Sequence, residues 1–84
     1  MSRQPETRDF SMLVVNVPGQ NRRVTAHYDP PHRARVTTNT YGMGLQTYEL
    51  DVVARSGSWL CVRQSAPGWP EWLAWVPLAH CTRI

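Results

Sequence analysis

Several residue types and patterns that mark particular protein classes are scarce in this chain of 84 residues. It has only two cysteines, Cys61 and Cys81, which are too few for a disulfide framework and have no metal-ligand spacing. No run approaches the roughly 18 apolar residues of a membrane span. The N-terminus has arginines but no apolar stretch behind them, so no secretory signal is indicated. We therefore expect a cytoplasmic protein, not bound to a membrane, with both thiols reduced.

Helical periodicity is also missing from the sequence. No window repeats apolar residues at i, i+3, i+4 and i+7 over the about ten residues that a helix needs. Short runs of β-branched and aromatic residues instead alternate with Pro, Gly, Asn and Ser. This pattern predicts an all-β fold of five to six short antiparallel strands. At this size a small closed barrel is favoured, because closing the sheet removes exposed edges.

The chain divides into a polar tail and one domain. Residues 1–10 are charged and aperiodic and predict a flexible N-terminal tail, whereas 11–84 form a single domain. The apolar run 12–17 predicts either a strand added to the sheet edge or an edge that faces a partner. Pro30 and Pro31 are expected to end a strand, since proline lacks the donor that a central strand needs. Alternating runs predict strands at 22–29, 45–54, 59–64 and 72–77, and 33–44 predicts a strand or a folded-back excursion.

Three segments resemble an SH3 domain. "AHYDP" (Ala26 to Pro30) stands where that family has its opening Tyr-Asp motif, and "LDVVARSGSWLCVR" (Leu50 to Arg63) resembles its central strand, loop and tryptophan. "AWVPLAHC" (Ala74 to Cys81) is similar to the small-aromatic-aliphatic-proline stretch before its last strand. The resemblance covers about 24–84. It implies an SH3-like barrel with a one-turn 3-10 helix at 77–80 and a last strand at 81–84.

The resemblance also implies a binding groove lined by aromatic side chains that pack against a peptide. The matching groove positions are Tyr28, Trp59, Trp75, Pro77 and His80. His80 stands where the family has a tyrosine. It further implies core-facing positions at Ala26, Leu50, Val52, Val62, Val76 and Cys81. Cys81 is then expected to be a buried, unreactive thiol. The four tryptophans include Trp72 and Trp75, which lie three apart on one strand and so face opposite ways.

The charged residues depart from the family pattern. All nine basic residues are arginine and none is lysine, giving a formal charge of +3. The loop between Tyr28 and Leu45 has His32, Arg33 and Arg35 where SH3 domains use acids to bind an arginine of the ligand, so an ordinary basic proline-rich ligand is disfavoured. Guanidinium groups bind phosphates and carboxylates bidentately, so they also indicate a basic patch. That patch comprises Arg22, Arg23, Arg33 and Arg35.

Residues for catalysis or metal binding do not converge in the sequence. No Gly-x-Ser-x-Gly elbow, phosphate-binding loop or paired-carboxylate arrangement is present. His27, His32 and His80 have no metal-ligand spacing. We therefore expect no enzymatic activity, no metal and no cofactor.

Three functions remain open at this point. The leading hypothesis is a non-catalytic module that binds a protein or peptide through the aromatic groove. The alternative is a nucleic-acid-binding barrel that uses the arginine patch for phosphates and tryptophans for base stacking. A third is an accessory, phage-like protein that occludes a host protein, using the edge at 12–17. Unpaired edges also leave a homodimer open.

Overall fold

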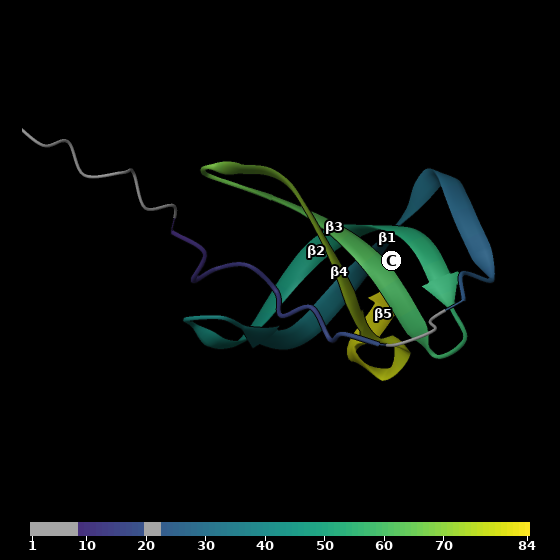
Figure 1. Cartoon of the computed structure of the whole chain (residues 1–84), viewed down its shortest axis with the longest axis horizontal. Coiled ribbons are helices and arrows are strands. Elements are labelled where there is room, and N and C mark those ends of the chain that lie inside the picture. The colour runs from purple at the N-terminus through teal and green to yellow at the C-terminus, as the bar shows by residue number, and fades with distance from the viewer. Residues whose placement is uncertain (1–8, 20–22) are drawn as a thin grey trace, which may run out of the picture.

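The computed structural model describes residues 9–19 and 23–84 and is built from one antiparallel sheet. Its strands are β1 (Ala26–Thr40), β2 (Gly44–Ser56), β3 (Trp59–Ala66), β4 (Trp69–Pro77) and β5 (Cys81–Arg83). They lie in the order β4-β3-β2-β1-β5, and a single 3-10 turn, η1 (Leu78–His80), precedes β5 (Figure 1). The all-β class, the antiparallel pairing and the 3-10 turn are confirmed. The sheet is open, because its edge strands β4 and β5 form no ladder with each other.

Glycine or proline is found in the β2–β3 and β3–β4 hairpins and at the 3-10 turn, where the sequence predicted turns. Gly57 and Gly68 take φ values of 58° and 79° in the β2–β3 and β3–β4 hairpins, a region that favours glycine. Pro77, with a φ of −62°, is the N-cap of η1. Its fixed φ suits that position, which confirms the predicted turn before the last strand.

The prediction that Pro30 and Pro31 end a strand is wrong. β1 continues through both prolines, but its register against β2 shifts there: His27 lies opposite Ala54 and His32 lies opposite Val52. Residues 28–31 form an excursion outside the ladder, so the missing proline donors cost nothing. In Figure 1 this part of β1, in blue, projects from the body of the sheet.

Alternate residues of the four long strands form the core. Val36, Val62 and Val76 are fully buried at its centre. Of the core positions that the resemblance implied, Leu50, Val52, Val62 and Val76 are buried, and Cys81 packs partly buried against them. Ala26 is a correction: it is partly exposed and outside the core cluster, because it begins β1 beyond the packed part of the sheet.

The apolar run 12–17 joins two parts of the sheet that are far apart in sequence. The Val15 amide donates to the carbonyl oxygen of Asn39 at the end of β1 (3.0 Å), and the Val17 amide donates to that of Trp75 in β4 (3.0 Å). Figure 1 shows the segment passing between the β1–β2 and β3–β4 hairpins. Val14 is fully buried and forms one bridge with Thr40. The predicted edge strand is therefore a single bridge whose side chains complete the core.

Gln64 holds this segment by its side-chain amide. Its Nε2 group donates to the carbonyl oxygen of Met12 and its Oε1 atom accepts from the amide of Val14, both at 2.9 Å. The Trp72 indole also donates to the carbonyl oxygen of Val14 (2.9 Å). Only 4% of Gln64 is exposed, so these backbone groups have their partners inside the protein.

We predict that Gln64→Ala destabilises the domain by about 1–3 kcal/mol, because it removes the partners of buried polar backbone groups. Urea unfolding measures this difference. Gln46→Ala is the matched control, since Gln46 makes one hydrogen bond, to Met43, that is exposed. We expect it to change stability by no more than about 0.5 kcal/mol. Equal effects of the two substitutions would contradict the role given to Gln64.

Candidate binding pocket and the predicted aromatic residues

Three of the predicted groove residues share one face of the β3–β4 hairpin. Trp59 lies opposite Pro77, and Trp75 lies opposite Cys61. Opposed residues of antiparallel strands project to the same side of the sheet, and neighbours along a strand project to opposite sides. Because Val76 is buried in the core, Trp59, Trp75 and Pro77 face away from it. We call these three residues the outer furrow.

A pocket of about 210 Å³ lies on the other, core-facing side of the sheet. It is bounded by the start of β1, by β2, β3 and η1, and by the short strand β5. Its lining residues are Tyr28, His32, Arg33, Ala34, Val52, Arg55, Leu60, Leu78, Cys81 and Arg83. Of the predicted groove residues, only Tyr28 lines this pocket. The structure therefore separates Tyr28 from the outer furrow by the thickness of the sheet.

His80, the fifth predicted groove residue, also lies outside the pocket. It is exposed on η1, and its Nδ1 atom is 3.2 Å from the hydroxyl oxygen of Thr38. Among the described residues no three His, Cys, Asp or Glu side chains lie close enough together to hold a metal ion.

The excursion at 28–31 shapes one wall of the pocket. Since these residues leave the ladder and return to it at His32, the rings of Tyr28 and His32 come together. They stack with centroids 4.1 Å apart and an interplanar angle of 24°. Tyr28 also packs against the core cluster. The lining of the pocket thus combines a stacked aromatic pair with aliphatic side chains, such as Leu60 and Leu78, which we call its floor.

Two arginines project to the pocket side of the sheet. Arg55 lies opposite Leu60 in β3, and Arg83 lies opposite Ala34 in β1, and both partners are buried core-facing residues. The Arg55 Nε group donates to the carbonyl oxygen of Gly57 (2.7 Å). Neither arginine forms an ion pair with any residue in the described ranges.

Other arginines are engaged on the outer face. Asp51 accepts from Arg63 at 2.9 Å and from Arg33 at 3.1 Å, which links three neighbouring strands. Arg35 forms a longer ion pair with Glu49, 3.6 Å between Nη2 and Oε1. The hydrogen bonds from Arg63 and then Arg33 lower the pKa of Asp51 from its ordinary value of 3.8. Arg33 contributes to the pocket wall while its guanidinium group binds Asp51.

The predicted basic patch is therefore partly neutralised. Arg33 and Arg35 each have a carboxylate partner, and Arg23 is exposed near the start of the second described range. Arg22 lies outside the described residues. The spacing of arginines in the sequence does not reveal these partners, because Glu49 and Asp51 come from the neighbouring strand β2.

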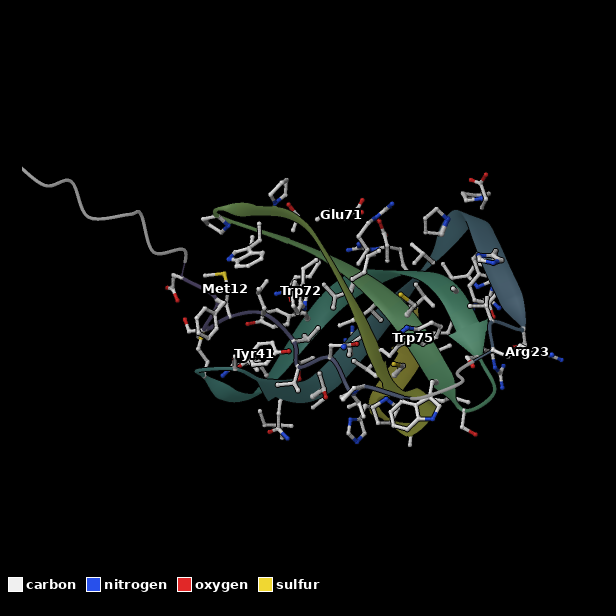
Figure 2. The ribbon with its side chains drawn as sticks, viewed as in Figure 1. Met12, Arg23, Tyr41, Glu71, Trp72 and Trp75 are labelled. Atoms are coloured by element: carbon white, nitrogen blue, oxygen red, sulfur yellow. The ribbon has the colours of Figure 1, made fainter. Side chains whose placement is uncertain are left out.

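Sequence reasoning also missed an aromatic cluster at the opposite end of the sheet. Tyr41 contacts Phe10 and Trp72 edge-on, with centroids 6.0 and 6.1 Å apart, and Trp72 contacts Trp69 at 5.6 Å. Figure 2 shows Tyr41 and Trp72 together with Met12, whereas Trp75 lies apart from them. Trp72 packs against the core and Trp75 faces outward, which confirms that the two point to opposite faces. The predicted strand alternation placed Trp72 but gave no sign of Phe10.

Both cysteines are free thiols. Burial raises the pKa of the Cys81 thiol to about 11, so the reactive thiolate is rare at neutral pH. This agrees with the low reactivity expected from the sequence. The prediction of a buried side chain is corrected to a partly buried one, which packs against the core and lines the pocket.

We predict that Asp51 makes the protein sensitive to acid. Its native pKa lies below the ordinary 3.8, so the native state binds a proton less readily than the unfolded chain. The stabilisation is present above that value and is lost as the pH falls below it. Urea unfolding from roughly pH 5 to 2 should show a smaller loss for Asp51→Asn than for the unchanged protein.

The comparison variant for this experiment is Asp9→Asn. Asp9 also has a lowered pKa, through hydrogen bonds from Ser11, but it takes no part in the ion pairs of Asp51 with Arg33 and Arg63. Asp9→Asn should still lose, as the pH falls, the stability that the ionised Asp51 provides. If Asp51→Asn loses as much stability in acid as the unchanged protein, the ion pairs of Asp51 do not contribute to the acid sensitivity.

The described part of the chain contains no helix with the length and apolar character needed to cross a membrane. In comparisons with protein-family models, curated proteins and solved structures, the chain matches none of them.

Proposed function

We propose that this chain is a non-catalytic binding domain of SH3-like architecture that docks a segment of a partner protein. The observation that carries the proposal is the pocket of about 210 Å³, which combines an aliphatic floor with the stacked Tyr28–His32 pair. Pockets that join apolar surface to a few fixed polar groups are the usual sites of ligand recognition.

The strand arrangement supports the SH3-like part of the proposal. A 3-10 turn after β4 returns the chain to β1, which pairs with both β2 and β5. The segment 11–17 bonds to β1 and to β4, so it partly spans the space between the two sides of the open sheet. In a small barrel the two edges of the sheet likewise approach each other.

Charge favours a protein ligand over a nucleic acid. Nucleic-acid binding depends on several arginines that remain free to neutralise phosphates. Of the arginines in the predicted basic patch, Arg33 and Arg35 have carboxylate partners on the outer face. The outer furrow supplies a second apolar surface, next to Leu73, of which 48% is exposed. The pocket is lined by residues of four strands and of η1, and we assign the docking site to it.

A library of short synthetic peptides with free C-termini tests the proposal. The full chain is immobilised, retained peptides are identified by mass spectrometry, and each is then titrated against the isotope-labelled protein by NMR. We expect amide shifts at Leu60, Leu78 and Cys81. Tyr28→Ala should weaken binding about tenfold or more, as truncation of a central aromatic contact does.

Trp59→Ala is the matched control, because it removes an aromatic side chain from the outer furrow and leaves the pocket unchanged. We expect its affinity to stay within about twofold. Because Tyr28 packs on the core, thermal unfolding of Tyr28→Ala must first show a folded domain. Shifts confined to the outer furrow, or no retained peptide, would contradict the pocket as the docking site. Salt-sensitive binding of single-stranded DNA with no peptide binding would favour the nucleic-acid alternative.

A further inference from the structure

We propose that the pocket recognises the C-terminal carboxylate of an apolar residue, held between Arg55 and Arg83. This inference rests on the proposed function and names the chemistry of its ligand. Arg55 and Arg83 come from different strands, β2 and β5, and both line the same pocket.

The register shows which arginines serve this pocket. Arg55 is opposite Leu60 and Arg83 is opposite Ala34, so both project to the core-facing side. Arg33 alternates to the other side, where Asp51 binds it. Neither Arg55 nor Arg83 has a carboxylate partner within residues 9–19 and 23–84.

The charge of the lining makes an anion the complementary ligand. No aspartate or glutamate lines the pocket, whereas Arg55 and Arg83 both do. The hydrogen bond from Arg55 Nε to Gly57 orients that guanidinium group and leaves its terminal nitrogens for a ligand. A guanidinium group and a carboxylate form charge-assisted hydrogen bonds, which are stronger than hydrogen bonds between neutral groups.

The floor of the pocket distinguishes a C-terminal residue from an acidic side chain. Ala34, Val52, Leu60 and Leu78 present aliphatic surface in the same pocket as the two arginines. An internal Asp or Glu would place only a short methylene stem there. A C-terminal apolar residue instead places its side chain on the floor and its carboxylate at the arginines, so both features are used. A cavity of about 210 Å³ suits one such residue.

Three small probes test this chemistry by NMR: N-acetyl-phenylalanine, its C-terminal amide, and N-acetyl-glutamate α-amide. We expect the free acid to shift the Nε–H signals of Arg55 and Arg83 together with the Leu60 and Leu78 amides. The amide-capped probe should bind about tenfold more weakly or worse, since it lacks the charge-assisted hydrogen bonds. Equal binding of the acid and its amide would overturn the proposal, and so would stronger binding of the glutamate probe.

Arginine variants provide the second measurement. Arg55→Gln and Arg83→Gln should each weaken the binding of N-acetyl-phenylalanine about tenfold. Arg35→Gln is the matched control, because it removes an arginine of the outer face that pairs with Glu49. It should leave the affinity unchanged. We call Arg55 and Arg83 together the carboxylate clamp. If Arg35→Gln weakens binding as much as Arg55→Gln and Arg83→Gln do, the effect is one of net charge and the assignment of the clamp is wrong.

The library peptides separate this inference from the proposed function. A retained peptide that shifts the pocket amides and loses binding when its C-terminus is amidated supports both. A peptide that shifts the same amides and binds equally well when amidated keeps the docking site but overturns the carboxylate clamp. Carboxylate-dependent binding of the small probe with no retained peptide supports the clamp and removes the peptide-docking function.

Discussion

The fold depends on the contact between the Gln64 amide and the segment 11–17. A side-chain amide presents one donor and one acceptor, as a peptide group does, so Gln64 satisfies Met12 and Val14 in place of a neighbouring strand. With those groups satisfied, Val14 can enter the core as a fully buried side chain. Without the segment, the core-facing side of an open sheet would expose apolar surface to water. One buried polar residue thus allows the apolar packing around it.

The pleat of the sheet separates two kinds of surface. On the outer face, Asp51 joins Arg33 and Arg63 across three strands, and its one carboxylate offsets one of the two positive charges. On the core-facing side, Arg55 and Arg83 border an aliphatic hollow without acidic neighbours in its lining. Residues of the same type therefore have different roles, according to the face on which the strand register places them, and on β2 the register shift between Val52 and Ala54 puts Arg55 on the side opposite to Asp51.

Much of the fold follows from local patterns in the sequence. Alternation places Val62 and Val76 in the core, glycine marks the β2–β3 and β3–β4 turns, and Pro77 marks the 3-10 turn. These features depend on neighbours along the chain. The resemblance to SH3 domains added Tyr28, which the structure places at the pocket.

What the sequence could not reveal depends on register and on distant pairing. The shift between His27 and His32 keeps β1 continuous through two prolines, contrary to the expected strand end. The same pairing decides that Arg33 binds Asp51 while Arg83 faces the pocket. Alternation with Val62 could have indicated that Gln64 faces the core, but its partners come from a segment about fifty residues away.

The excursion at 28–31 has a consequence for how such a domain can diversify. Its backbone contributes no rung to the β1–β2 ladder, so residues can be added or exchanged there while the pairing on either side is kept. Tyr28 belongs to this excursion and also lines the pocket. Ligand preference can therefore change at 29–31, next to the pocket residue Tyr28, while the strand pairing and the packing of Tyr28 on the core are kept.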